Sequence, residues 1–442
     1  MNEPDRKSGP LASFFREGLA EVTHGSRRYH LWMASLTFLM CCGAFAYSVQ
    51  IRQGLAATGM HDHVSWGLYI SNFTFLVGVA AAAVVLVLPT YVLNDLDFAQ
   101  AVLIGEAVAV ASVVMAIAFV VVDVGGPARL WHLIPVIGIF NWPGSMLAWD
   151  ILVLNGYLLI NLALPFYILF AHYRGRTPDK RHYLPAVMLS IVWAVSLHLI
   201  TAFLYAGLPA RPYWNNALLG PRFLATAFTA GPALIIIILQ TLRRVTDFVV
   251  EEATIQKIAL VVTVAAQISL VMLISELFTE FYRTTHHGLS AQYLYFGLHG
   301  HNMLRPWIWT SIAMSVAATG MLSVHTIRTR ERFLRLACFL LFAAILIEKG
   351  LGTIIPGFIP EPWGRIDEYF PTWVEIVVSV GIWALGCFVF TILCKIAIPI
   401  ELGRRRYAGS SPAGVQAAQG VQFGGVARHG LGSKHHDPGG AG

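Results

Sequence analysis

The residues best suited to chemistry in this sequence are carboxylates and histidines placed at the ends of long apolar segments or inside them. The clearest carboxylate is Asp150, in the stretch PGSMLAWDILVLNGYLLIN, where a turn leads into an apolar run. An anion in the first turn of a helix is favoured by the helix dipole, so Asp150 could be an ordinary boundary residue. A carboxylate at a partly desolvated helix start can also exchange protons with a ligand. Both interpretations are open for this residue taken alone.

His198 is the one histidine, of sixteen, that lies well inside an apolar segment. An ionisable side chain at that depth is costly and usually faces a cavity or a partner, although a structural histidine with satisfied hydrogen bonds is the alternative. A haem held by two histidines would need a second histidine at similar depth. The others lie at segment ends, in loops or in the tail. We therefore expect no b-type haem.

The five cysteines argue against other resident redox groups. None of them forms a C-x-x-C or C-x-x-C-H motif, which would indicate an iron–sulfur cluster or a covalently attached haem. We expect small packing residues between helices, at Cys41, Cys42, Cys338, Cys387 and Cys394. With no iron–sulfur cluster, haem or metal of its own, a redox protein of this kind must exchange electrons with a partner or a diffusible carrier.

The elements that must position these residues are long apolar helices. The 442 residues are 56% hydrophobic and 12% charged, whereas a soluble domain has about 25% charged residues. A helix needs about 20 apolar residues to cross a bilayer core of about 30 Å, and helices leave no backbone group unpaired in lipid. The sequence therefore predicts an all-α polytopic membrane protein of about ten transmembrane helices. The expected spans are residues 30–51, 66–93, 99–122, 148–172, 184–206, 223–242, 256–278, 305–326, 333–350 and 374–397.

Positive charge is distributed unevenly between the two sides of these spans. With the N-terminus inside, most of the 30 Lys and Arg residues fall on one side, which is the positive-inside signal. We expect a multi-pass protein of the bacterial cytoplasmic (inner) membrane with both termini in the cytoplasm. The same distribution argues against a nucleic-acid partner. The expected units are a cytoplasmic N-terminal segment 1–29, a membrane domain 30–400 and a disordered cytoplasmic tail 401–442.

Most polar groups in or beside the expected spans collect in the outer half of the membrane. Taken singly, the tryptophans could be an interfacial aromatic belt, and Asp123 could be a boundary carboxylate. Together, several titratable groups at one depth, ringed by aromatic residues, predict a pocket for an amphipathic ligand with exchangeable protons. The residues at this depth are His61, Asp62, His63, Trp66, Tyr69, Asn72, Asp123, Arg129, Trp131, His132, Ser145, Trp149, Asp150, His198, Glu276 and Glu280.

A thinner set of polar residues lies further toward the cytoplasmic side. Asn155 stands between the two sets, although an asparagine in a membrane helix can instead bridge helices. These residues predict a proton path from the cytoplasm to the outer pocket. The path comprises Glu106, Asp123, Asn155 and Asn161, with Asn94, Asp95 and Asp97 in the short inner turn at its entrance.

Several long motifs resemble the NrfD/PsrC family of quinone-interacting membrane subunits. They are HLITAFLYAGLPARPYWNNALLGPRFLATAFTAGPAL (198–234), WGLYISNFTFLVG (66–78), and DVGGPARLW followed by NWPGSMLAWD. SELFTEFYRTTHH (275–287) and YLYFGLHGHNMLRPWIWTS (293–311) resemble most closely the DsrP/HmeB type, the membrane subunit of the sulfite-reductase-associated DsrMKJOP complex. The membrane subunits of alternative complex III and of menaquinone reductase are the nearest alternatives.

The resemblance implies two four-helix bundles, about 66–206 and 223–350, with one further helix at each end. F75-x-x-G78 and F228-x-x-G231 open equivalent spans of these halves. The family resemblance also implies a bound quinone, menaquinone or ubiquinone, near the outer face. There a ferredoxin-like iron–sulfur partner would dock, in a complex that also contains cytochrome subunits.

Carried over to this sequence, the resemblance assigns roles to individual residues. His198 or His132 would hydrogen-bond a quinone carbonyl, and Asp150 would exchange a proton with it. The remaining residues of the expected quinone pocket are Trp66, Tyr69, Asn72, Ser145, Trp149 and Glu276.

The predicted function is therefore electron exchange between the quinone pool and iron–sulfur subunits of a respiratory complex, in dissimilatory sulfur metabolism. Protons taken from the cytoplasm would make turnover move charge across the membrane, worth about 2.3 kcal/mol per charge per 100 mV. Two alternatives belong to other classes. A secondary transporter would suit Gly/Pro-interrupted helices such as ATAFTAGPALI, and a passive anchor for redox subunits would leave the polar cluster without a role.

Overall fold

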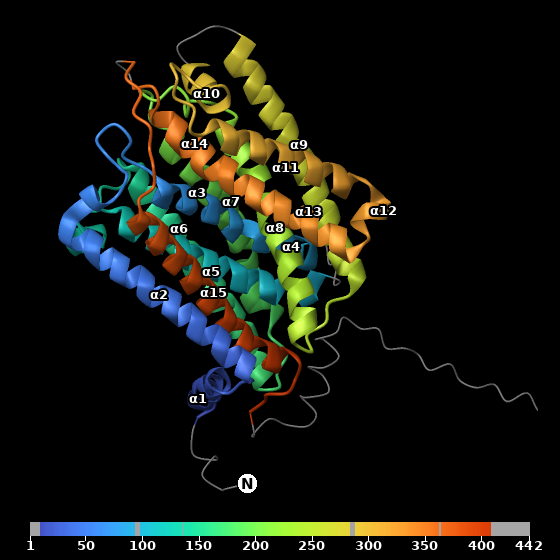
Figure 1. The fold of residues 1–442 in the computed structure, drawn as a ribbon. Helices are drawn as coiled ribbons and strands as arrows, with labels where there is room; N and C mark the ends of the chain where they lie inside the picture. The colour runs from blue at the N-terminus through green and yellow to red at the C-terminus, as the bar shows by residue number, and fades with distance from the viewer. Residues whose placement is uncertain (1–8, 93–97, 135, 283–287, 362–363, 408–442) are drawn as a thin grey trace, which may run out of the picture.

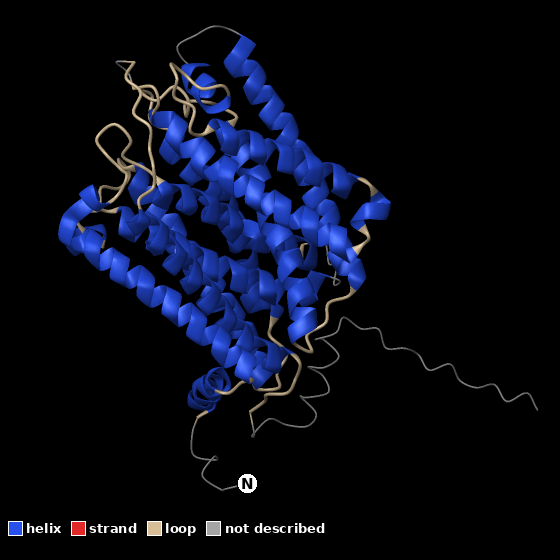
Figure 2. Cartoon of the chain, in the orientation of Figure 1, coloured by secondary structure: helices blue, strands red, loops and turns tan. Residues whose placement is uncertain are grey.

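The computed structural model describes residues 9–92, 98–134, 136–282, 288–361 and 364–407. Within these ranges the chain is built from helices and the turns between them, and it contains no β-strand (Figure 2). The inner-turn residues Asn94, Asp95 and Asp97, and most of the tail 401–442, lie outside the described residues. The predicted all-α architecture is confirmed.

Nine of the described helices are long and apolar enough to cross a membrane. The expected span 305–326 corresponds to α11, which has 19 residues and is not among the nine. Its serines, threonines and tryptophans make it less apolar than its neighbours. The long helices are α2 (Arg27–Gln53), α3 (Leu68–Ala80) continued by η3 (Ala81–Ala83) and α4 (Val84–Tyr91), α5 (Ala99–Asp123), α6 (Met146–Tyr173), α7 (Lys180–Ala206), α8 (Leu219–Val245), α9 (Glu252–Tyr282), α11 (Arg305–Ser323), α13 (Glu331–Ile345) continued by η6 (Leu346–Leu351), α14 (Gly352–Ile354) and η7 (Ile355–Phe358), and α15 (Trp373–Glu401).

Short polar residues begin several of these helices by pairing backbone N–H groups that a helix start leaves free. Ser26 accepts from the N–H of Tyr29 at the start of α2, and Asp179 accepts from that of Arg181 at the start of α7. Thr372 forms a reciprocal capping box at the start of α15. The shorter helices are α1 (Pro10–Thr23), η2 (Gly54–Ala57), η5 (Pro127–Leu133), α10 (Gly288–Tyr295) and α12 (His325–Arg328).

The long helices alternate in direction, so their connections gather at two ends of the molecule (Figure 1). We call the end that carries α10, η2 and η5 the α10 side, and the end that carries α1 and α12 the α1 side. The α10 side is the one expected to face outward.

The described helices form two groups of long helices, and two further helices flank the first group. α3–α4, α5, α6 and α7 pack against one another, and α8, α9, α11 and α13 do the same. The flanking helices α2 and α15, from opposite ends of the chain, lie side by side, and α15 packs against α5 (Figure 1). Gly43 and Gly381 let them approach closely, since a Cβ on Gly43 would lie 2.8 Å from Gly381 Cα. Small residues at such contacts are what allows membrane helices to pack tightly.

The two bundles meet along α3 and α8, which run in the same direction. A Cβ on Gly231 would lie 2.5 Å from Ala82 Cβ, and one on Gly78 would lie 3.8 Å from Ala227 Cα. Both glycines belong to the repeated F-x-x-G motif. The repeat therefore places its glycines where the two bundles touch.

The expected N-terminal segment 1–29 contains α1, which packs against α6 and α15 at the α1 side. Phe14 is buried and makes edge-to-face contacts with Phe166, Phe170 and Tyr173. The hydroxyl of Tyr173 also donates to Glu17 Oε1 at 2.8 Å. This short helix is therefore attached to the membrane domain by an aromatic cluster.

Candidate functional site

The first bundle encloses a carboxylate–hydroxyl pair between α6 and α7. Asp150 is 1% exposed, and its Oδ1 accepts a hydrogen bond of 2.7 Å from Thr201 Oγ1. The Leu197 carbonyl lies 3.0 Å from the same hydroxyl, which has only one proton to donate. A boundary carboxylate would face solvent or lipid headgroups, whereas Asp150 faces the interior of the bundle.

His198 lies one helical turn before Thr201 on the same face of α7 and is fully buried. Its Nδ1 is 2.9 Å from the carbonyl oxygen of Ala194, so Nδ1 carries the proton in this bond. In the neutral ring, Nε2 is then a hydrogen-bond acceptor; it makes no hydrogen bond of good geometry among the described residues, although the backbone of Gly78 lies close to the ring. Buried polar atoms are nearly always paired, so this acceptor is a candidate ligand contact.

Aromatic residues from both bundles form a wall beside this pair. The ring of Trp66 lies 5.7 Å from each of the rings of Tyr205 and Trp214, and also 5.7 Å from Phe358. The hydroxyls of Tyr205 and Thr74 share a hydrogen bond of 2.5 Å, and Tyr205 is close enough to Asp150 to feel its charge. Tyr205 therefore contacts Trp66 and lies within electrostatic range of Asp150.

Tyr69 and Asn72 point in another direction. The hydroxyl of Tyr69 donates to Gln50 Oε1 of α2 at 2.7 Å, and Asn72 Oδ1 accepts from Trp383 Nε1 of α15 at 2.9 Å. These side chains hold α3 against the flanking helices. The structure does not bring Tyr69 and Asn72 to Asp150, although their helix, α3, begins two residues after Trp66.

Asp123 belongs to the same neighbourhood as Tyr69. Its Oδ1 is buried without a partner among the described residues, and it lies close enough to Tyr69 and Glu375 to interact electrostatically with both. Glu375 accepts from the backbone N–H of Gly59 at 2.6 Å and from the hydroxyl of Tyr369. Asp123 is thus part of a polar contact between the first bundle and α15.

His132, Ser145 and Trp149 lie in or beside the loop that joins α5 to α6 on the α10 side. The His132 ring is partly exposed and stacks on Trp131 at 3.8 Å, while Trp149 packs on Trp142 at 3.8 Å. Ser145 precedes α6 without a side-chain cap, and its carbonyl accepts from the Ala148 N–H. Among the described residues no contact joins His132 to Asp150 or His198.

The inner polar set is only partly aligned with the site. Glu106 is 4% exposed and Asn161 is 6% exposed, and both lie near Tyr157. Tyr157 and Asn161 follow Asp150 by seven and eleven residues, so they share its helix face. Asn155 instead lies on the exposed face of α6, where its Nδ2 donates to the Ile151 carbonyl at 2.8 Å. Tyr157, rather than Asn155, therefore lies between Asp150 and Asn161 on this face of α6.

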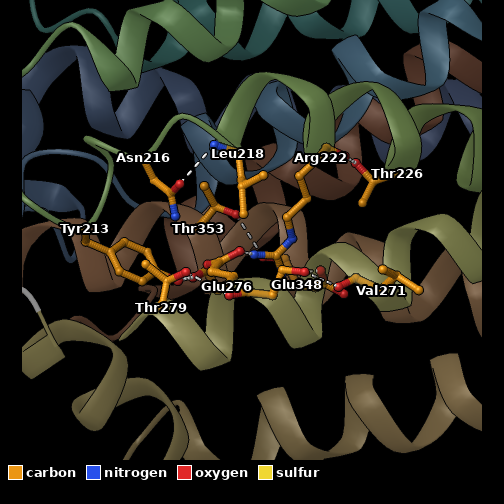
Figure 3. A network of polar contacts seen from close by, with 12 residues as sticks. Tyr213, Asn216, Leu218, Arg222, Thr226, Val271, Glu276, Thr279, Glu348 and Thr353 are labelled. Carbon is orange, nitrogen blue, oxygen red and sulfur yellow. Dashed lines mark hydrogen bonds and ion pairs between the residues drawn. The ribbon is translucent and has the colours of Figure 1, made fainter. Parts of the chain in front are cut away.

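Sequence reasoning missed a charge cluster in the second bundle. Arg222 of α8 lies between two carboxylates, Glu276 of α9 and Glu348 of η6 (Figure 3). The three side chains are 11%, 13% and 7% exposed. Glu276, expected in the quinone pocket, is therefore an ion-pair partner in the other bundle. The signal available in the sequence was Glu348–Lys349 inside the apolar run LLFAAILIEKGLG, because charges buried among apolar residues must be paired.

Lys349 follows Glu348 and lies at the contact between the two bundles. It is 3% exposed, and its Nζ donates to the Phe223 carbonyl at 3.2 Å and lies 4.5 Å from the centre of the Phe223 ring. A Cβ on Gly78 of α3 would meet this Nζ at 2.8 Å, so the ammonium lies at the surface of the first bundle. It is near enough to act electrostatically on His198.

Comparison with known proteins places the chain in one family. Residues 56–351 match the model of the polysulphide reductase NrfD family. The chain is 23% identical over 397 residues to the membrane subunit of a putative dimethyl sulfoxide reductase from Halobacterium salinarum, covering 81% of this chain and 88% of that protein. It is 21% identical over 415 residues to a selenate reductase subunit from Mesobacillus selenatarsenatis, covering 84% and 94%.

A third relative, from Archaeoglobus fulgidus, is named as the integral membrane subunit of an Hdr-like menaquinol oxidoreductase. It is 23% identical over 216 residues, which are 49% of this chain and 51% of that protein. The family model covers most of this chain, from the end of the first long helix to the charge cluster. The chain is an integral membrane protein of the NrfD family.

Proposed function

We propose that this protein is the quinone-reactive membrane subunit of a multisubunit redox complex. It would exchange electrons between menaquinone or ubiquinone and an iron–sulfur subunit docked on the α10 side. The observation that carries the proposal is the buried Asp150–Thr201 pair one helical turn from His198, whose Nε2 makes no hydrogen bond of good geometry among the described residues. A quinol has hydroxyl protons to donate, and a quinone has carbonyls to accept, so this mixture of groups suits both forms.

Each side chain has a distinct task in this proposal. His198 Nε2 accepts a hydrogen bond from a quinol hydroxyl, and its ring is held in place by the bond from Nδ1 to Ala194. Asp150 gives or takes a proton through the Thr201 hydroxyl, which can donate and accept. A bound quinone supplies exchange of two electrons and two protons. The wall of Trp66, Tyr205 and Trp214 packs against an aromatic ring and excludes water, which strengthens polar interactions inside the site.

The names of the relatives support a redox assembly. One is named as a dimethyl sulfoxide reductase membrane subunit, one as a selenate reductase subunit, and one as an integral membrane subunit of a menaquinol oxidoreductase. We propose the same kind of role here, with a ferredoxin-like iron–sulfur partner and cytochrome subunits. The motifs that resemble the DsrP/HmeB type favour a complex of dissimilatory sulfur metabolism in a bacterial inner membrane.

The α10 side has a surface suited to such a partner. Its loop between α5 and α6 exposes several large apolar side chains, and contiguous apolar surface of this kind marks interaction sites. The exposed residues are Trp131, Ile134, Val136, Ile137, Ile139 and Trp142. A partner docked there would lie over the start of α6, close to Asp150. We propose that this side faces outward and that both termini are cytoplasmic.

The proposal is tested by purifying the protein with its partners and analysing extracted lipid for bound quinone. Turnover of a short-chain menaquinol is then compared in wild type, His198→Ala and Asp150→Asn. We expect each variant to lose about 10²-fold in kcat/KM, the usual contribution of one acid–base group. Asp150→Asn keeps an acceptor for Thr201, so its loss should appear in kcat.

Ser190→Ala serves as the matched control, because this buried hydroxyl on α7 donates only to the Val187 carbonyl of its own helix. Its turnover should equal that of wild type. Wild-type turnover in both His198→Ala and Asp150→Asn would contradict the site assignment. A complex without bound quinone and without quinol turnover would contradict the function itself.

A further inference from the structure

The turn at Glu348 and Lys349 places two adjacent buried charges against neighbouring residues of α8, Arg222 and Phe223. It is a π-helical turn (Leu346–Leu351), and such turns are frequent at functional sites because they rotate side chains out of the regular helix pattern. Glu348 pairs with Arg222 inside the second bundle, whereas the Nζ of Lys349 lies against Gly78 of the first bundle. This one turn therefore connects the charge cluster with the surroundings of His198.

Two small cavities in the second bundle meet at Glu348. The first, on the α10 side, is lined by Tyr213, Arg222, Thr226, Glu276, Glu348 and Lys349. The second continues from Glu348 toward the α1 side between α8, α9, α11 and α13. Its polar lining consists of Thr229, Ser269, Ser315, Thr319 and Glu348. Hydroxyl groups that line a narrow cavity can relay protons through water, since each one both donates and accepts.

Thr319 marks the middle of this polar line. It is 6% exposed, and its hydroxyl has no partner among the described residues although it borders the second cavity. Thr229 and Thr263, also buried in this bundle, donate to their own helices, to the Ala225 carbonyl at 2.9 Å and to the Ala259 carbonyl at 2.7 Å. The Thr319 hydroxyl is therefore available to the cavity.

The polar line continues at the α1 side. Gln240 of α8 follows Thr229 by eleven residues, on the same helix face, and is 1% exposed. Its Nε2 has no partner among the described residues, and its Oε1 accepts from Arg335 Nε at 3.0 Å. Arg335 in turn pairs with Glu331, which is about one-third exposed. Polar groups thus lie both at the α1 surface and around Glu348, with Thr229 and Gln240 about 16 Å apart along α8.

We propose that protons reach and leave the quinone site through the second bundle, with Lys349 as the last proton carrier before His198. The proposal rests on the proposed function, since it names the proton route of that same site. It competes with the route through Glu106, Tyr157 and Asn161 in the first bundle.

The steps of this route move protons only. The ammonium of Lys349 gives a proton to His198 Nε2 or to a group hydrogen-bonded there, and becomes a neutral amine. It regains a proton from the cavity that it shares with Glu348, and the hydroxyl line supplies that proton from the α1 side. For quinol oxidation every transfer runs in reverse. Lysine can change its protonation state in this way, whereas arginine keeps its proton in proteins.

The experiment measures short-chain menaquinol turnover by the purified complex in H₂O and D₂O. Thr319→Val removes one hydroxyl at constant shape and should lower kcat by about tenfold, raise the solvent isotope effect and leave KM unchanged. Lys349→Arg keeps the positive charge but removes the transferable proton, and should lower kcat by about tenfold or more at unchanged KM. Thr263→Val is the matched control and should equal wild type, because Thr263 lines neither of the two cavities and its hydroxyl is bonded to its own helix.

Wild-type kcat and isotope effect in both Thr319→Val and Lys349→Arg would overturn the route. Loss of turnover in Glu106→Gln alongside that result would assign the protons to the first bundle. A wild-type complex that binds and oxidises no quinol is a different outcome. It would overturn the proposed function, and the route would fall with it.

Discussion

Replacing Arg222 by methionine is expected to lower the free energy of unfolding by about 3–5 kcal/mol, the cost of leaving a buried charge uncompensated. Arg222 pairs with both Glu276 and Glu348, and all three side chains are at most 13% exposed. Its removal leaves two carboxylates facing each other across the space that the guanidinium occupies. The loss of stability should approach the upper end of this range, because repulsion between the two carboxylates adds to the desolvation cost of burying each one.

The neutral triple variant Arg222→Met, Glu276→Gln, Glu348→Gln provides the internal test. Because it contains no unpaired charge, most of the lost stability should return. Arg244→Met is the matched control: Arg244 is 55% exposed where it pairs with Glu331, and such surface pairs contribute about 0–1 kcal/mol. Thermal and denaturant unfolding of the detergent-solubilised protein measure all three. Equal losses in Arg222→Met and Arg244→Met, or no recovery in the triple variant, would refute the reasoning.

Three further substitutions test the packing that surrounds the site. Gly231→Val brings side-chain atoms onto Ala82 and should destabilise the contact between bundles by about 1–3 kcal/mol; full stability in a thermal unfolding experiment would contradict that close contact. Gly357→Ala places a methyl group directly against the Trp214 ring, so quinol KM should rise while the protein still folds; an unchanged KM would separate the aromatic wall from the site. Phe14→Ala removes the anchor of α1, and limited proteolysis near residue 24 should become faster at unchanged quinol turnover; an unchanged cleavage rate would show that Phe14 does not hold α1.

The architecture could be predicted from the sequence because membrane spans depend on length and apolar content alone. Only α11 is ambiguous by that criterion, since its serines, threonines and tryptophans lower its apolar content. The pairing of α2 with α15 could not be predicted in the same way. It depends on a close approach at Gly43 and Gly381, which are distant in the sequence.

The depth of a residue in the membrane could be predicted better than the direction in which its side chain points. Asp150 bonds to Thr201, one turn from His198, and Trp66 packs on Tyr205, but Tyr69 and Asn72, at similar depth, point to α2 and α15. Depth follows from counting residues along a helix, whereas direction depends on how each helix is rotated within its bundle.

The rotation of α6 within its bundle also decides which residues of the inner polar set lie on the face that carries Asp150. The spacing from Asp150 would have favoured Tyr157 and Asn161 over Asn155, since positions seven and eleven residues away return to the same face. The charge cluster was missed for another reason. Expected span 333–350 ends beside Glu348 and Lys349, which made them resemble ordinary boundary charges, whereas the helical segment continues to Phe358.

The central claim is that a quinone head group binds between α6 and α7 beside Asp150 and His198. Photolabelling of the purified complex with an azido-menaquinone, followed by mass spectrometry of the modified peptides, tests it most directly. The account predicts labels within Met146–Tyr173, within Lys180–Ala206 and at Trp66, displaced by excess unlabelled menaquinone. Displaceable labels confined to α8, α9, α11 or α13 would contradict it.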